Sequence, residues 1–217
     1  LYSAQMDRSF RQGMSWFILS EVMFFMAFFG ALFYGRVIAL DWLSGGSNNA
    51  MTFAILWPDF QAMWPLLKTP GGIETQAMPA TGLPLINTVI LVVSSITLHF
   101  AHTCLEQNKR GQLKFMLLLT ILLGATFLSL QVYEYIHAYR DLGLTLASGF
   151  YGNTFFLLTG FHGMHVTLGA IILFFIFLRV LKGHFTPEKH FAFQAGAWYW
   201  HFVDVVWLCL YVFVYIL

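Results

Sequence analysis

The chain has 217 residues, of which 59% are hydrophobic, 18% aromatic and only 10% charged, with a mean hydropathy of +0.71. This composition is too apolar for a soluble globular domain of this length and predicts an integral membrane protein. The formal net charge of +1 leaves no basic excess for binding nucleic acid. The two cysteines, Cys104 and Cys209, lie on different predicted spans and support neither a disulfide framework nor a CxxC metal site.

Five segments are long and apolar enough to cross a bilayer, which takes roughly 20 largely apolar residues in a helix. In chain order they cover approximately residues 14–40, 84–105, 113–137, 150–178 and 197–217. Between the first two spans, residues 41–83 are rich in Gly and Pro and predict a long connection on the non-cytoplasmic side. The sequence therefore predicts an all-α, polytopic protein in which residues 1–217 form a single membrane domain.

The positions of Lys and Arg predict the orientation, because these residues accumulate in short loops on the cytoplasmic side. The residues before the first span and the loops 106–114 and 179–196 lie on the same side of the membrane. The cations on that side are Arg8, Arg11, Lys109, Arg110, Lys114, Arg179, Lys182 and Lys189. The other side has Arg36, Lys68 and Arg140. We therefore expect the N-terminal side to face the cytoplasm, or the matrix of a mitochondrion, and the C-terminus to lie on the opposite side.

One carboxylate, Glu21, interrupts the first predicted span about seven residues from its cytoplasmic end. An ionisable group inside a span costs on the order of 2.5 kcal/mol or more, so it marks a functional site by default. The alternative is that Glu21 snorkels to the interface or is satisfied by a neighbouring helix.

Other polar residues in the predicted spans are candidates for a buried polar, proton-related cluster. They are His99, His102, His162, His165, His201 and Asp204. His99 and His102 are spaced i,i+3, as are His201 and Asp204, which places each pair on one helix face. Gln131 and Glu134 lie at the opposite end of the third span, where we expect a partly hydrated interface.

The segment GFHGMHV brings His162 and His165 within one helical turn of each other, a spacing that suits a metal or haem site. No carboxylate is spaced to complete a carboxylate-bridged metal site. The glycines around the two histidines favour close helix packing with interhelical hydrogen bonds instead. We therefore predict no metal ligand on this chain.

The loop 179–196 places several cationic side chains behind an apolar helix. They are Arg179, Lys182, His184, Lys189 and His190. Such a cluster can hold a lipid phosphate, bidentately in the case of Arg. The alternative is that these residues reflect only the charge bias of cytoplasmic loops.

Several segments, in the same order, together resemble subunit III of haem-copper cytochrome c oxidases. They are RQGMSWFILSEVMFF, LPLINTVILVVSSITLHFAH, LQVYEYIHA, GFYGNTFFLLTGFHGMHVTLGAIIL and AWYWHFVDVVWLCLYVFVYIL. The resemblance covers nearly everything from Gly13 onward, and it implies a fold of seven helices in groups of two and five. This sequence supplies the larger group, lacks the first two helices and begins with Leu1. Either it starts partway into a longer protein, or the first two helices have been removed or are provided by another chain.

The resemblance also implies a function. The family's third subunit is non-catalytic, packs against catalytic subunit I in a complex that includes subunit II, binds structural phospholipids and supports proton uptake during oxygen reduction. By motif match it assigns lipid binding to Arg179, Lys182, His184 and Glu21, and it identifies Glu21 as the family's buried glutamate, beside the lipid-filled cleft that lies between the two helix groups. It implies no metal or haem on this chain, with haem a and copper on the partner subunits.

Three alternatives remain open at this stage. A quinol oxidase has a related third subunit, and a stand-alone haem or metal enzyme is a more remote possibility. A transporter is equally remote, because the sequence has no inverted repeats and no paired helices broken by Gly or Pro. The GFHGMHV and AWYWHFVDVVWL segments favour an oxidase of the cytochrome c, aa3 type. The long 41–83 connection favours the bacterial inner membrane over the mitochondrial one.

Overall fold

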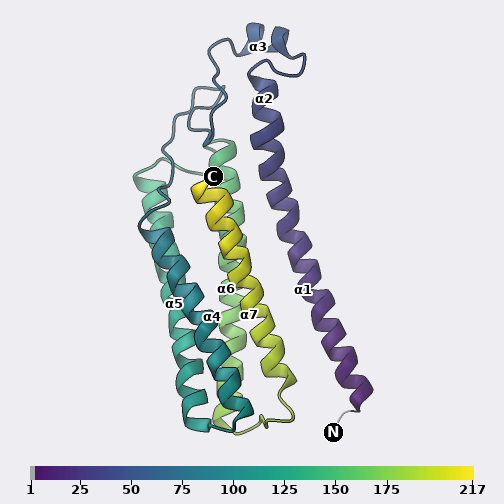
Figure 1. Cartoon of the computed structure of the whole chain (residues 1–217). Helices are drawn as coiled ribbons and strands as arrows, with labels where there is room; N and C mark the ends of the chain where they lie inside the picture. Colours follow the sequence, from purple (N-terminus) through teal and green to yellow (C-terminus); the bar gives the residue numbers. More distant parts are fainter. Residues whose placement is uncertain (1–2) are drawn as a thin grey trace. The chain divides into compact units, whose positions relative to one another are not determined.

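The computed structural model describes residues 3–217, and helices account for most of them (Figure 1). The long helices are α1 (Ala4–Phe33), α4 (Leu83–Glu106), α5 (Arg110–Arg140), α6 (Phe150–Leu181) and α7 (Phe191–Leu210). Shorter elements are η1 (Tyr34–Ala39), α2 (Leu40–Leu43), α3 (Ala50–Leu56) and η2 (Tyr211–Ile216). The prediction of an all-α fold is confirmed.

Five continuous helical stretches have the length and apolarity of membrane spans, as predicted. They cover Ala4–Leu43, Leu83–Glu106, Arg110–Arg140, Phe150–Leu181 and Phe191–Ile216. The first begins about ten residues earlier than hydropathy indicated, because its polar opening turns are also helical. There Arg11 Nε donates to Asp7 Oδ2 at 2.8 Å, an i,i+4 pair that supports a helix. Hydropathy marks the apolar part of a helix and misses polar turns that extend beyond it.

Contacts divide the chain into two compact units. The first contains residues up to Val22, Ala80–Tyr133 and Phe161–Leu217, and the second contains Met23–Pro79 and Glu134–Gly160. Helices α1, α5 and α6 each continue from one unit into the other. All the site residues predicted from the sequence belong to the first unit.

The core of the first unit is built around two tryptophans of α7. Trp200 is completely buried, and its indole N–H donates to Ser94 Oγ of α4 at 3.0 Å. Its ring lies against Gly124 of α5 and Gly169 of α6, where an added Cβ would approach the ring to 2.6 and 2.9 Å. Trp207 is equally buried and donates to Thr88 Oγ1 of α4 at 2.9 Å. Small residues thus allow four helices to pack closely around large rings, as is common in membranes.

The second unit has its own aromatic packing. Trp64, in the connection between α3 and α4, contacts Phe150 and Tyr151 at the start of α6. The guanidinium of Arg36 lies 5.6 Å from the centre of the Trp64 ring, within cation–π range. Glu134 is only 1% exposed in this unit. The expectation that Glu134 faces a partly hydrated interface is therefore wrong, because its position near a helix end does not determine which way it points.

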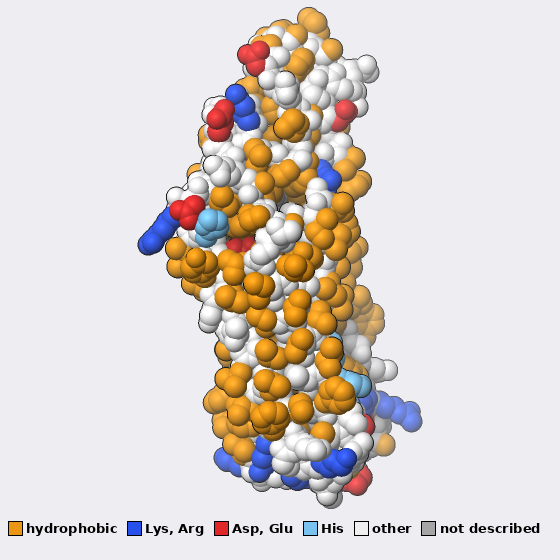
Figure 2. Space-filling view, turned by 60° about the vertical axis from the view of Figure 1, so that its left-hand side comes forward, with side chains coloured by type: hydrophobic (Ala, Val, Ile, Leu, Met, Phe, Trp, Pro, Cys, Tyr) orange, Lys and Arg blue, Asp and Glu red, His pale blue; other side chains and the backbone are white. Residues whose placement is uncertain are grey.

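Hydrophobic side chains cover most of the surface seen in Figure 2, while several Lys and Arg gather at the lower end of that face and others are scattered over its upper half. Large apolar side chains are exposed in the helices, including Trp16 at 70%, Phe115 at 62% and Phe175 at 61%. Such extensive apolar exposure is incompatible with a water-facing surface and is expected for helices that contact lipid. The chain is a multi-pass membrane protein.

Candidate functional site

Glu21 of α1 and His165 of α6 form a direct pair, with Glu21 Oε2 2.6 Å from His165 Nε2. His165 Nδ1 lies 2.6 Å from the carbonyl oxygen of Phe161. Because a carbonyl oxygen only accepts hydrogen bonds, Nδ1 carries a proton. The short contact between Nε2 and the Glu21 carboxyl group requires a second proton between these two atoms. That proton resides either on the carboxyl group or on the imidazole. The site thus holds one proton between two titratable groups whose side chains are only 24% and 5% exposed.

His162 bonds in a different direction from His165. Its Nε2 donates to the carbonyl oxygen of Val203 in α7 at 3.1 Å, and the side chain is completely buried. The imidazole lies against the rings of Phe127 and Trp207, with centroids 5.7 and 5.1 Å away. The two histidines of the GFHGMHV segment therefore connect α6 to two different helices, α7 and α1. This arrangement corresponds to interhelical hydrogen bonding.

A second polar group lies between α4 and α7. His201 Nδ1 is 2.5 Å from Ser95 Oγ, and Asp204 lies one turn further along α7. Asp204 is 7% exposed, and within residues 3–217 neither of its carboxylate oxygens has a partner in hydrogen-bonding geometry. Ser95 is near enough to interact with this carboxylate, but its hydroxyl is directed to His201. His201 and Asp204 share a helix face, as predicted.

The two histidines of α4 differ in burial, in contrast to the prediction that both are buried. His102 is partly buried, and its Nε2 lies 3.2 Å from Nε2 of His190. His99 is exposed on the surface of α4. The prediction that His99 belongs to a buried cluster is corrected, because three residues along a helix turn the side chain about 60° away from its neighbour's direction.

A cavity of about 640 Å³ lies between the first turns of α1, the end of α6 and the start of α7. Its apolar wall includes Phe10, Phe17, Phe185, Phe191 and Tyr199. Its polar lining consists of Arg179, His184, Lys189 and His190. The cavity is thus mostly aromatic, with cationic side chains grouped in the segment from Arg179 to His190.

Two of the three basic residues matched to lipid binding line this cavity. Arg179 is held over the Phe185 ring, 4.7 Å from its centre, and accepts the His184 amide through its carbonyl oxygen at 3.1 Å. Lys182 is exposed and does not line the cavity. Glu21 also lies outside the lining, although it belongs to the same unit.

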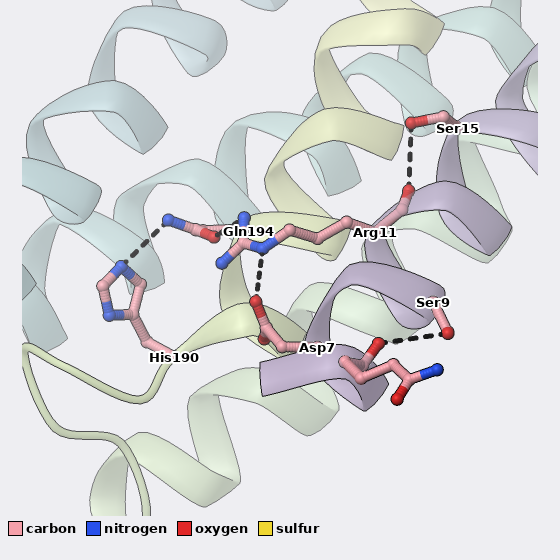
Figure 3. Close-up of polar contacts among 7 residues, drawn as sticks. Asp7, Ser9, Arg11, Ser15, His190 and Gln194 are labelled. Carbon is pink, nitrogen blue, oxygen red and sulfur yellow. Dashed lines mark hydrogen bonds and ion pairs between the residues drawn. The ribbon is translucent and has the colours of Figure 1, made fainter. Parts of the chain in front are cut away.

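A chain of hydrogen bonds attaches α1 to α7 beside this cavity (Figure 3). Arg11 Nη1 donates to Gln194 Oε1 at 2.7 Å while its Nε donates to Asp7. Gln194 Nε2 lies 3.2 Å from His190 Nε2, which continues the chain to His102. Sequence reasoning missed the roles of Asp7, Arg11 and Gln194. The i,i+4 spacing of Asp7 and Arg11 was a visible helix signal, but nothing in the sequence indicated Gln194 as a partner.

Replacing Arg11 with alanine should loosen the first turns of α1 by about 1 kcal/mol, because the mutation removes one hydrogen bond and one partly exposed ion pair. Amide exchange over residues 4–13 should then be about fivefold faster. Arg8→Ala is the matched control, because Arg8 is exposed on the same helical segment. Equal exchange rates in the two variants would show that the contact to Gln194 does not hold α1.

The chain matches the family model described as cytochrome c oxidase subunit III over residues 2–217. Similar curated proteins, each named cytochrome c oxidase subunit 3, come from Loxodonta africana, Mus musculus and Drosophila melanogaster. The first two are 42% and 40% identical over 209 residues, which cover 96% of this chain and 70% of each relative. The fly protein is 42% identical over 205 residues, covering 94% of this chain and 68% of the relative. The chain therefore belongs to the cytochrome c oxidase subunit III family and is a subunit of the terminal oxidase complex.

Proposed function

We propose that this chain is the non-catalytic third subunit of an aa3-type cytochrome c oxidase. In this role it packs against catalytic subunit I in a complex with subunit II, holds structural phospholipid and supports proton uptake while oxygen is reduced to water. Haem a and copper belong to the partner subunits. The observation that supports the lipid role is the cavity between α1, α6 and α7, which combines an aromatic wall with a cationic end.

The two ends of the cavity suit the two ends of a phospholipid. The planar guanidinium of Arg179 is positioned by Phe185 and offers paired N–H donors to a phosphate. His184 and Lys189 add donors at the same end. Acyl chains lie against the rings of Phe10, Phe17 and Tyr199. A lipid held in this way contacts α1 and α7 together and stabilises their packing.

The proton-related part of the proposal rests on the Glu21–His165 pair. This pair shares one proton at 2.6 Å, in a setting where the helices exclude most water. It keeps α1 fixed against α6 beside the lipid cavity. We propose that the pair supports proton uptake by holding α1 against α6. The alternative to test is that the shared proton itself exchanges during turnover.

We also propose that the basic end of the first unit faces the cytoplasm or the mitochondrial matrix, in accordance with the charge bias of short loops. The bacterial inner membrane stays a prediction from the long 41–83 connection. The mammalian and fly relatives favour the mitochondrial inner membrane instead.

Arg179→Ala should lower the amount of phospholipid that co-purifies with the assembled oxidase, because it removes the main phosphate donor of the cavity. The measurement is lipid per complex by mass spectrometry, with activity followed over many turnovers. We expect loss of at least half of the tightly bound anionic lipid and faster inactivation during turnover. Lys182→Ala is the control, because Lys182 is exposed, carries the same charge and lies outside the cavity.

Equal lipid loss in both variants would assign the effect to charge alone and reject the cavity as the binding site.

The oxidase type is tested separately by the reduced-minus-oxidised spectrum of the complex before and after its subunits are dissociated. Haem a bands that stay with a larger partner support the proposal. Bands of b or o type would favour a quinol oxidase. Haem bands that stay with this chain after dissociation would show that the chain itself is a haem protein.

A further inference from the structure

Among residues 3–217, one group of three His and Glu side chains converges closely enough to hold a metal ion. It consists of His102 and Glu106 at the end of α4 and His190 immediately before α7. One potential ligand atom from each residue lies within 4.8 Å of the other two. We propose that these three residues form a binding site for a divalent transition metal of the Zn²⁺ type.

The distances fit such an ion. Zn–N bonds of about 2.0–2.1 Å around a tetrahedral ion place two ligand nitrogens roughly 3.3 Å apart. The Nε2 atoms of His102 and His190 are 3.2 Å apart, and Glu106 Oε1 is 3.7 Å from Nε2 of His102. The centres of the two rings are 5.2 Å apart and their planes are inclined at 65°, so the rings do not stack on each other. Two imidazoles and one carboxylate leave a fourth position for water.

The surroundings of His190 orient it as a ligand. Its Nδ1 donates to the carbonyl oxygen of Thr186 at 3.1 Å, which keeps the proton on Nδ1 and leaves the Nε2 lone pair directed to His102. Metal-binding histidines are commonly held by such a second hydrogen bond. The side-chain amide nitrogen of Gln194, Nε2, lies 3.2 Å from Nε2 of His190, and a metal replaces this donor when it binds.

The site is also accessible. Glu106 is 55% exposed, and His190 lines a cavity of about 270 Å³ that includes the carboxylates of Asp7 and Glu188. The cavity, which Arg11 and Lys189 also line, provides a path by which an ion reaches His190. A bound ion joins the last turn of α4 to the residue that precedes α7, so it fixes the end of the first unit that also carries the lipid cavity.

The test is Zn²⁺ binding to the assembled complex, measured by equilibrium dialysis with radioactive Zn²⁺ alone as the probe. We expect His102→Asn and His190→Asn each to remove one bound ion per complex. Glu106→Gln changes only an exposed side chain and should weaken that site at least tenfold without affecting folding. His99→Asn is the matched control, because His99 is exposed one turn away on α4.

Zinc X-ray absorption of the loaded complex should show a zinc with two imidazole ligands in the wild type, and this signal should be missing from either histidine variant. Unchanged stoichiometry and affinity in all three ligand variants would overturn the proposal, leaving His102 and His190 as a hydrogen-bonded pair. The same loss in His99→Asn would also overturn it, because that result would show a nonspecific effect of histidine content.

Discussion

Trp200→Ala should destabilise the helix packing of the first unit by about 2–4 kcal/mol. A buried Trp→Ala change in a soluble protein costs roughly 3–5 kcal/mol. In lipid the transfer of apolar surface from water contributes less, but the cavity and the lost dispersion contacts remain. Trp200 is completely buried against Gly124 and Gly169, neither of which has a side chain to fill the space. The substitution also leaves Ser94 without its indole donor.

The measurement is unfolding of the purified complex in detergent, by heat or denaturant, with assembly of the subunit checked on the native complex. Trp198→Ala provides the control, because Trp198 lies on the same helix two residues away and is 37% exposed. We expect its effect to be below about 1 kcal/mol. Losses of equal size in both variants would show that the ring of Trp200 is not central to the packing of α4, α5, α6 and α7.

The number and order of the membrane helices were predictable because each span is a long apolar segment bounded by charged or Gly- and Pro-rich residues. Their ends were less predictable. The first helix starts at Ala4, where its exposed turns are polar and give no hydropathy signal. Gly124, Gly169 and Gly196 mark close helix packing, but only the folded chain shows that the first two face Trp200 and the third faces Ile176.

The individual site residues were also easier to predict than their partners. Glu21 and His165 are each conspicuous in an apolar segment, yet they are 144 positions apart and no local spacing connects them. The i,i+3 rule grouped His99 with His102 on α4, whereas the actual neighbour of His102 is His190 in a distant loop. Long-range pairing depends on how helices pack, and a single sequence contains little information about that.

Glu21→Ala should destabilise the packing of α1 on α6 by about 1–3 kcal/mol, because it leaves Nε2 of the buried His165 without the partner seen at 2.6 Å. Glu21→Gln should cost less than about 1 kcal/mol, since an amide keeps the side-chain shape and can donate to or accept from Nε2 of the imidazole. Ser20→Ala is the control for the helix, because Ser20 is exposed and its hydroxyl bonds only to the preceding turn at Phe17.

The same three variants distinguish a structural from a chemical role when oxygen consumption is measured on complexes with equal subunit and lipid content. If the pair acts by fixing α1, Glu21→Gln should retain most of the wild-type turnover while Glu21→Ala inactivates faster. An amide cannot accept and release the shared proton at neutral pH. Severe loss of turnover in Glu21→Gln, with assembly and lipid intact, would therefore contradict the structural role and place Glu21 directly on a proton path.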